Sequence, residues 1–498
     1  MPFVDIVSKA DYVSLWYNTN TFNNNVGIFD PAKPTLVLLH PVGLDSSWMQ
    51  AQAEDPRLHN SYNMVMFDTR MTGPSETRYT GKYDLWVAAA DLAHAFYHLR
   101  LPPSHIFAPD LYSGVAMRFA ALFPELCLSI TLLNVMNPAP PLVEQLEEMQ
   151  SLWAKAPDLE TFEHVCKEML KVYGGPHAHP DLQDDIVAFW ETTFPPFRRV
   201  VSKMQLDCLV NTVPLTPTEL AAITAPTLII QADNNPTHAM AWAEQLVTGL
   251  VNVKDGASIF QVKTSAGYLS IVSASIVNQV LSKFLSRLPR SERPSQPLHV
   301  NERLTDFMAR ALTRLADFKD DSSILIRDPS SPISFSCLSP EMEKRQTEGI
   351  AEFAKDAHKA FSPLGPDGRP IRKFSERYDR NHWLNTGQDG FTRTGILRSC
   401  STHSLTIFLT LHPLIEFRKD LEPNLRKRHK QGDRRVFITD TNGAASPPSP
   451  TLVEESDLQV ARRRQKNGVN PSTVDKQNVR GAMGKVVSSA SVLPRVLM

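Results

Sequence analysis

Residues 105–125 read HIFAPDLYSGVAMRFAALFPE, and this stretch holds the clearest structural signal in the chain. The apolar run 105–110 predicts a strand, and residues 112–123 place apolar side chains at helical spacing. A strand that leads directly into a helix makes a sharp corner, and Asp110 stands at this corner. Asp110 is therefore the first candidate for a functional residue.

Strand and helix alternate over about the first 290 residues. Continuous apolar runs predict buried strands, and a period near 3.6 residues predicts helices. The predicted strands are 35–40, 63–68, 105–110, 130–135, 227–232 and 258–263, and the predicted helices include 86–100, 112–123 and 271–286. This alternation predicts the α/β class, with a mostly parallel sheet flanked by helices.

A long insertion separates the fourth predicted strand from the fifth. Its sequence looks helical throughout, from LVEQLEEMQSLWAKA (142–156) to FRRVVSKMQLDCLV (197–210). About 90 residues are too many for a crossover connection and too apolar for a loop. We therefore expect a helical cap over about 138–222, within a first domain of residues 1–290.

The composition changes after Pro289. RSERPSQP (290–297) reads as a linker, and we expect residues 291–361 to form a linker with short helices. Residues 362–498 are rich in Pro, Gly, Ser and charge, which predicts a long, largely disordered tail.

The tail is basic, although the whole chain has a net charge of −1. From Arg418 onward there are sixteen Lys and Arg residues against eight Asp and Glu. NLRKRHK (424–430) and ARRRQK (461–466) are typical of nuclear localisation or nucleic-acid patches, and the alternative is a solvated segment without such a role. The apolar segment 404–415 is either a docking segment or an artefact such as retained non-coding sequence.

Cysteine usage and hydropathy argue against several classes of protein. The five cysteines are scattered, without zinc-ligand or disulfide-framework spacing, which favours a reducing compartment. Residues 1–14 lack the features of a signal peptide, and LTIFLTL (405–411) is too short to span a bilayer. We expect a cytoplasmic or nuclear protein with no membrane partner, no metal and no cofactor.

Several motifs, in the right order, resemble the α/β-hydrolase-fold superfamily over residues 1–290. LLHPVG (38–43) is similar to its HGxG oxyanion loop, and FDTRMTGPS (67–75) to its D-x-R-x-x-G-x-S turn. MRFAALFPE (117–125) sets the register of the nucleophile corner, and APTLIIQAD (225–233) is similar to the strand before the catalytic acid. The resemblance implies the family's fold and cap, and the divergent sequence looks fungal.

The register places Asp110 where the family's G-x-S-x-G motif has its serine. An aspartate there resembles the epoxide hydrolases and haloalkane dehalogenases, whose carboxylate attacks carbon to form an ester. Tyr112 argues against this role, because it replaces the glycine that lets helix and strand approach. The alternative is that Asp110 is the N-cap of helix 112–123. Ser113 would be the nucleophile only if the corner moved by three residues.

The other two triad positions also depart from the family. Asn235 takes the place of the acid, and it can orient an imidazole but cannot stabilise its cation. Asp233 is either a substitute acid or a turn residue. Tyr268 takes the place of the histidine, and a phenol with a pKa of about 10 is a poor base at neutral pH. His238 is the displaced-base candidate, with a surface role as the alternative.

The resemblance assigns the oxyanion hole to the backbone N–H groups of Val42 and Leu111. The three departures together predict a degenerate triad, and hence a non-catalytic binding or scaffold protein. Its ligand would be a small apolar molecule in the pocket between sheet and cap. The first alternative is an unconventional hydrolase that uses Asp110 on epoxides or haloalkanes. The second is a nuclear regulatory protein whose tail meets nucleic acid or an import receptor.

Overall fold

The computed structural model describes residues 2–137, 143–175, 177–288 and 302–378. In these residues nine strands form one sheet, in the order β1-β2-β4-β3-β6-β7-β8-β9, with β5 paired to β2. The strands are β1 (Phe3–Val7), β2 (Tyr12–Thr19), β3 (Thr35–Leu39), β4 (Asn63–Phe67), β5 (Glu76–Thr77), β6 (Ser104–Pro109), β7 (Cys127–Leu133), β8 (Thr227–Ala232) and β9 (Ser258–Val262).

The sheet is parallel from β4 to β9 and antiparallel at its N-terminal end. Strands β3, β4, β6 and β8 are buried at every position, as their continuous apolar sequences predict for strands covered on both faces. The predicted mostly parallel sheet is therefore confirmed. The N-terminal strands β1 and β2, which no pattern predicted, add an antiparallel edge.

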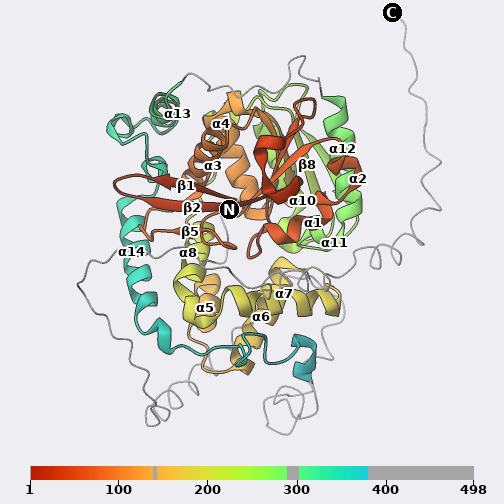
Figure 1. Ribbon diagram of the computed structural model, residues 1–498, viewed down its shortest axis with the longest axis vertical. Coiled ribbons are helices and arrows are strands. Elements are labelled where there is room, and N and C mark those ends of the chain that lie inside the picture. The colour runs from red at the N-terminus through yellow and green to blue at the C-terminus, as the bar shows by residue number, and fades with distance from the viewer. Residues whose placement is uncertain (1, 138–142, 176, 289–301, 379–498) are drawn as a thin grey trace, which may run out of the picture. The chain divides into compact units, whose positions relative to one another are not determined.

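Fourteen α-helices lie in the described residues. They are α1 (Gln50–Ala53), α2 (Pro56–His59), α3 (Leu85–Leu99), α4 (Ser113–Leu122), α5 (Val143–Ala154), α6 (Leu159–Tyr173), α7 (Pro180–Thr193), α8 (Arg199–Val210), α9 (Pro217–Ala221), α10 (Met240–Gly249), α11 (Leu269–Val272), α12 (Ala274–Arg287), α13 (Leu304–Lys319) and α14 (Pro340–Ala354). Figure 1 shows the insertion helices α5–α8 gathered into one layer.

Alternate residues of β3 belong to two buried clusters, one for each face of the sheet. Val37 and Leu39 pack with residues of α3 and α4, whereas Leu36 and Leu38 pack with residues of α12. Successive side chains of a strand point to opposite faces, so one short strand supports both helical layers. The α/β class is confirmed by this three-layer arrangement.

The turn after β4 is held by a buried ion-pair network. Arg70 donates from Nε to Asp91 of α3 at 2.6 Å and from a terminal nitrogen to Asp11 at 2.5 Å. All three side chains are almost fully buried. The network joins the N-terminal strands, the turn and α3, and it accounts for the arginine of the D-x-R motif as a structural residue.

Residues 302–378, expected to be a linker and the start of a tail, pack against the rest of the domain. In α13, the ring of Phe307 lies 5.5 Å from that of Phe123. In α14, the side chain of Gln346 bonds both backbone groups of Tyr83, and α14 also runs beside cap helix α8. The segment thus contacts both the sheet layer and the cap.

The packed segment continues beyond residue 362, where the tail was expected to begin. Arg372 forms a 2.5 Å ion pair with Glu163 of cap helix α6. A 3₁₀ turn, η11 (Phe374–Tyr378), contacts α7. The rest of the predicted tail, including 404–415 and both basic clusters, lies outside the described residues.

Candidate functional site

Asp110 occupies the corner between β6 and α4. Its φ is +49°, in the left-handed region, and the 3₁₀ turn η4 (Asp110–Tyr112) leads from it into α4. Aspartate tolerates this region better than most residues, so the corner has the expected geometry. No side-chain capping bond forms at η4 or α4, and among the described residues neither carboxyl oxygen has a partner at normal hydrogen-bond geometry, the closest donor being the backbone N–H of Val42. The alternative prediction of an N-cap is therefore wrong.

His238 lies directly beside Asp110. Its Nε2 is 3.6 Å from Oδ1 of Asp110, and the two residues are 2% and 3% exposed. Burial raises the pKa of Asp110 well above its usual value, and a smaller effect of the nearby Val42 amide opposes this shift. Burial lowers the pKa of His238 to about 3. Burial therefore disfavours the charged forms of both groups, and the two are too far apart for a normal hydrogen bond.

Asn235 orients the imidazole of His238. Its Oδ1 lies 3.2 Å from Nδ1 of His238 and also accepts the backbone N–H groups of Thr237 and His238. Its Nδ2 donates to the carbonyl of Ser265 at 3.0 Å. An amide oxygen only accepts, so Nδ1 carries the proton and the lone pair of Nε2 faces Asp110. The predicted alternative of a surface role for His238 is wrong, because the side chain is buried.

Tyr268 fills the position of the family's histidine. The residue is 1% exposed, its hydroxyl donates to the carbonyl oxygen of Val42 at 2.9 Å, and its ring stacks on Tyr173 of the cap. Burial raises the pKa of its phenol well above 10. Tyr268 is therefore a hydrogen-bond donor to the oxyanion loop and no base at neutral pH.

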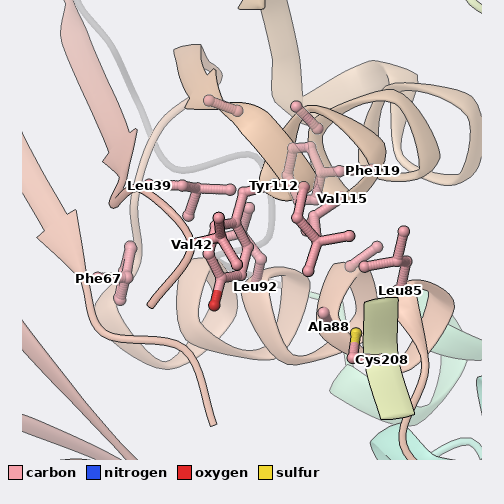
Figure 2. Packing of buried hydrophobic residues seen from close by; sticks show 14 of the residues in the cluster. Leu39, Val42, Phe67, Leu85, Ala88, Leu92, Tyr112, Val115, Phe119 and Cys208 are labelled. Atoms are coloured by element: carbon pink, nitrogen blue, oxygen red, sulfur yellow. The ribbon is translucent and has the colours of Figure 1, made fainter. Parts of the chain in front are cut away.

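The oxyanion loop is packed from several sides. His40 bonds the carbonyl of Pro41 through Nδ1 at 2.9 Å, so its ring holds the backbone. Tyr112 donates to or accepts from Thr69 at 2.9 Å, and its ring lies edge-on to His40. Figure 2 shows Tyr112 within the buried cluster that includes Val42. The large side chain that replaces the family's glycine is accommodated here.

Two further candidates have structural roles. Ser113 is 2% exposed and donates from Oγ to the carbonyl of Ala108 at 2.9 Å. Asp233 is exposed and accepts the backbone N–H of Thr264 at 2.9 Å. The hydrogen bond of Ser113 therefore connects α4 to β6, and that of Asp233 stabilises the turn after β8.

Two of the cavities among the described residues lie near the corner and are much larger than the pocket of about 10 Å³ at Leu111 and Tyr112. The first, about 70 Å³, is beneath the cap and is lined by Val42, Gly43 and cap residues that include Trp153 and Trp190. The second, about 170 Å³, lies between α4, α10 and the two chain segments that connect the cap to the sheet. Its lining includes Leu85, Asp110, Leu111, Met117, Arg118, Val213, Trp242 and Leu246. Each Asp110 oxygen has less than 1 Å² of accessible surface, so the carboxyl is not open to this cavity.

Residues 35–240 match the family model described as alpha/beta hydrolase fold. This domain belongs to the α/β-hydrolase-fold superfamily. No curated protein sequence matches the chain.

Solved structures similar to the α/β-hydrolase domain include three bacterial proteins. An enol-lactonase from Burkholderia xenovorans LB400 is 14% identical, with 57% of this chain and 100% of that chain covered and a TM-score of 0.47. A hydrolase from Pseudomonas aeruginosa PA01 is 18% identical, with 57% and 98% covered and a TM-score of 0.46. A thermophilic esterase from Thermogutta terrifontis is 17% identical, with 58% and 99% covered and a TM-score of 0.46.

The residues that the sequence analysis missed are Tyr173 and Arg118. Tyr173, at the end of α6, stacks on Tyr268, and the sequence of α6 has the pattern of an ordinary apolar helix. Arg118 is a lone charge within the apolar run MRFAAL (117–122), which is a usable signal because a buried charge requires compensation. In the described residues, no group of three acidic, His or Cys side chains could hold a metal ion. None of the described helices has the length and apolar character of a membrane span.

Proposed function

We propose that the α/β-hydrolase domain binds a small, mainly apolar molecule and does not hydrolyse esters by triad chemistry. One observation carries this proposal: the carboxyl of Asp110 is enclosed against His238, while the cavity beside it is large and mainly apolar. A closed nucleophile position next to an open cavity favours binding over attack on a substrate.

The size of each cavity selects the binding site. An apolar cavity of about 150 Å³ holds benzene. The cavity under the cap, at about 70 Å³, is less than half this size, whereas the cavity at the Asp110 corner, at about 170 Å³, exceeds it. We therefore place the ligand at the corner, between α4, α10 and the ends of the cap, rather than under the cap helices.

The ionisation of the site argues against catalysis in the resting protein. Burial raises the pKa of the Asp110 carboxyl and so favours its protonated form, which is a weaker nucleophile than the carboxylate. The hydroxyl of Tyr268 donates to the backbone and supplies no base. The site therefore lacks the nucleophile and the base that ordinary serine-type hydrolysis requires.

Binding is tested with a panel of neutral probes, such as toluene, benzyl alcohol and cyclohexanol, followed by ligand-observed NMR on the full chain. The variant Leu246→Trp fills the cavity, since Leu246 lines it. Leu325→Trp is the matched control, because Leu325 is 53% exposed. We expect binding to be lost in Leu246→Trp and kept in the control. Equal binding by all three proteins would exclude the corner cavity as the site.

The second candidate is a hydrolase that uses Asp110, and the 3.6 Å separation from His238 favours it. Transfer of the Asp110 proton to Nε2 would yield a carboxylate and an imidazolium. The carboxylate would attack a carbon of an epoxide or haloalkane and form an ester. In an epoxide the ring-opened alkoxide stays on the ester and takes the imidazolium proton. From a haloalkane a halide leaves, and the imidazolium gives its proton to solvent water. Neutral His238 would then take a proton from water, and the hydroxide would cleave the ester to return the Asp110 carboxylate.

Esters, epoxides and haloalkanes incubated with the wild type, Asp110→Asn and His238→Ala separate the two candidates. The binding proposal predicts no turnover above background in any of them and no gain in protein mass. Turnover that disappears in Asp110→Asn, together with an ester adduct that accumulates in His238→Ala, would establish the hydrolase instead. The third prediction, a nuclear role of the tail, rests on residues outside the described part of the chain.

A further inference from the structure

Arg118 is a buried cation in the wall of the corner cavity. The residue is 4% exposed, and it lines the cavity together with Asp110. One terminal nitrogen donates to the carbonyl of Gly114 at 3.1 Å and the other to the carbonyl of Val213 at 2.6 Å. A guanidinium has five N–H donors, and its buried Nε–H has no acceptor among the described residues. Because Nε has less than 1 Å² of accessible surface, the donors left for a ligand are the second N–H groups of the two terminal nitrogens.

No carboxylate of the described residues forms an ion pair with Arg118. The acidic groups that raise its pKa most are Asp84 and Glu219, followed by the thiols of Cys337 and Cys208. Asp84 accepts three backbone N–H groups, and Glu219 pairs with Lys319 at 2.6 Å. Burial lowers the pKa of Arg118 in spite of them. The guanidinium also lies over the ring of Trp86, 5.1 Å from its centroid, and this cation–π contact compensates part of its charge. No carboxylate of the described residues pairs with it directly, and a buried charge without an ion-pair partner is costly.

The lack of a side chain at Gly114 makes room for the guanidinium of Arg118. A Cβ atom at residue 114 would lie 3.3 Å from a terminal nitrogen of Arg118 and 2.7 Å from the side chain of Leu85. Side chains of a helix lean towards its N-terminus, and the guanidinium accordingly lies back over Gly114. Since Gly114 is one helical turn after Asp110, the cation is held at the side of the cavity that adjoins the corner.

We propose that the corner cavity takes a small monocarboxylic acid, whose carboxylate pairs with Arg118 and whose apolar body fills the space lined by Leu85, Leu209 and Leu246. This inference rests on the proposed binding function and names its ligand class. A carboxylate supplies the acceptors that the guanidinium lacks, and charge-assisted hydrogen bonds of this kind are about twice as strong as neutral ones.

The charge and size of the site restrict the ligand further. One arginine balances one negative charge, so a doubly charged phosphate would leave a buried anion uncompensated. A volume of about 170 Å³ fits a body of about the size of benzene. The structure therefore points to aromatic or cyclic acids of the size of benzoate.

Residues 211–216 provide the entrance through which a ligand reaches the corner cavity. They connect α8 to α9 without regular secondary structure, and Val213, whose carbonyl accepts from Arg118, is 49% exposed. A ligand carboxylate that enters past this segment replaces the Val213 carbonyl as an acceptor. The chain can adjust there, because no helix or strand has to move.

The test uses isothermal titration calorimetry on the full chain, with benzoate against benzamide and cyclohexanecarboxylate against its amide. In the wild type we expect each acid to bind about tenfold more tightly than its amide, as a charge-assisted hydrogen bond implies. In Arg118→Met the two affinities should become equal. Arg303→Met, which removes an arginine that is 81% exposed, should keep the preference of the wild type.

Each outcome decides the inference. Equal affinities of acid and amide in the wild type would overturn the role of Arg118, even if Arg118→Met did not fold, and would leave the cavity proposal intact. An acid preference that survives in a folded Arg118→Met would overturn it as well. Absence of binding by all four probes would overturn the ligand class, and the neutral probes with Leu246→Trp then decide the binding function separately.

Discussion

Nδ1 of His238 lies 3.2 Å from Oδ1 of Asn235, so the residue at the acid position orients an imidazole from its own loop. In the arrangement that the family resemblance implies, this imidazole would come from the loop after β9, where Tyr268 now stands. The short turn η7 (Pro236–His238) brings the ring to Asp110 from the loop after β8 instead. The site therefore has a nucleophile position, an imidazole and an orienting amide, and burial disfavours the charged forms of the first two.

Replacement of Asn235 by aspartate should favour the charged form of the His238 imidazole. A carboxylate 3.2 Å from Nδ1 stabilises the imidazolium form, so Asn235→Asp should raise the pKa of His238 from about 3 by at least one unit. NMR titration of the imidazole signal, assigned with His238→Gln, measures the shift. Asp233→Asn is the control, because exposed Asp233 bonds only the turn. An unchanged pKa in Asn235→Asp would show that Asn235 does not control His238.

The raised pKa of Asp110 predicts a pH-dependent difference in stability. In the unfolded chain this carboxyl ionises at about pH 4, whereas burial raises its pKa in the folded protein. Between these values the folded state holds a proton that the unfolded state lacks, so wild-type stability falls as pH rises. Asp110→Asn removes this dependence. The variant should therefore gain about 1.4 kcal/mol over the wild type per pH unit above about 4, until the folded pKa is reached.

Urea unfolding at pH 4, 6 and 8 checks this slope. Asp317→Asn is a matched control, since it makes the same substitution at an exposed residue of α13. A constant difference between Asp110→Asn and the wild type from pH 4 to 8 would mean that Asp110 is ionised in the folded protein. The hydrolase would then become the better candidate.

The strands of the central sheet could be predicted, because they are buried on both faces and their apolar runs are continuous. The corner could be predicted from the register of MRFAALFPE, and Asp110 has the positive φ expected there. From the sequence, the contact between Asp110 and His238 could be given only as one possibility. It depends on the path of η7, and a loop path of this kind has no periodic pattern.

The packing of α13 was missed for a different reason. Its residues Phe307, Ala311 and Leu315 repeat every four positions and form one buried face. This face is too small to form a second core of its own. It instead completes the first core, against Phe123 of the sheet domain. An amphipathic helix therefore does not reveal from its own sequence which core it joins.

Gly267 should be intolerant of any side chain. A Cβ atom there would overlap the carbonyl group of Tyr173 in the cap, and the N–H of Gly267 donates to Gly174 at 3.2 Å. Because the obstacle is backbone, Gly267→Ala should lower the free energy of unfolding by about 3 kcal/mol and increase proteolysis of the cap. Gly27→Ala, where the nearest atom is the tip of the Asn25 side chain, should be close to neutral. Equal stabilities of the two variants would argue against this close approach of cap and sheet domain.

Residues 302–378 should be required for a stable domain. Phe307 and Phe335 are at most 1% exposed, and their rings lie 5.5 and 6.3 Å from that of Phe123. Burial of each ring stabilises the fold by about 2 kcal/mol, and removal of the segment also uncovers Phe123. A chain that ends at residue 290 should therefore melt at a lower temperature than one that ends at 378, and it should bind a hydrophobic dye.

Point variants in the 1–378 chain separate packing from chain length. Phe307→Ala should lower the free energy of unfolding by about 3–5 kcal/mol. Ile326→Ala, at a residue that is 88% exposed, should change it by less than about 0.5 kcal/mol. If the 1–290 chain were as stable as the 1–378 chain, residues 302–378 would be a linker after all. Because α14 and Arg372 contact the cap, the same comparison measures how far this segment stabilises the cap beside the cavity.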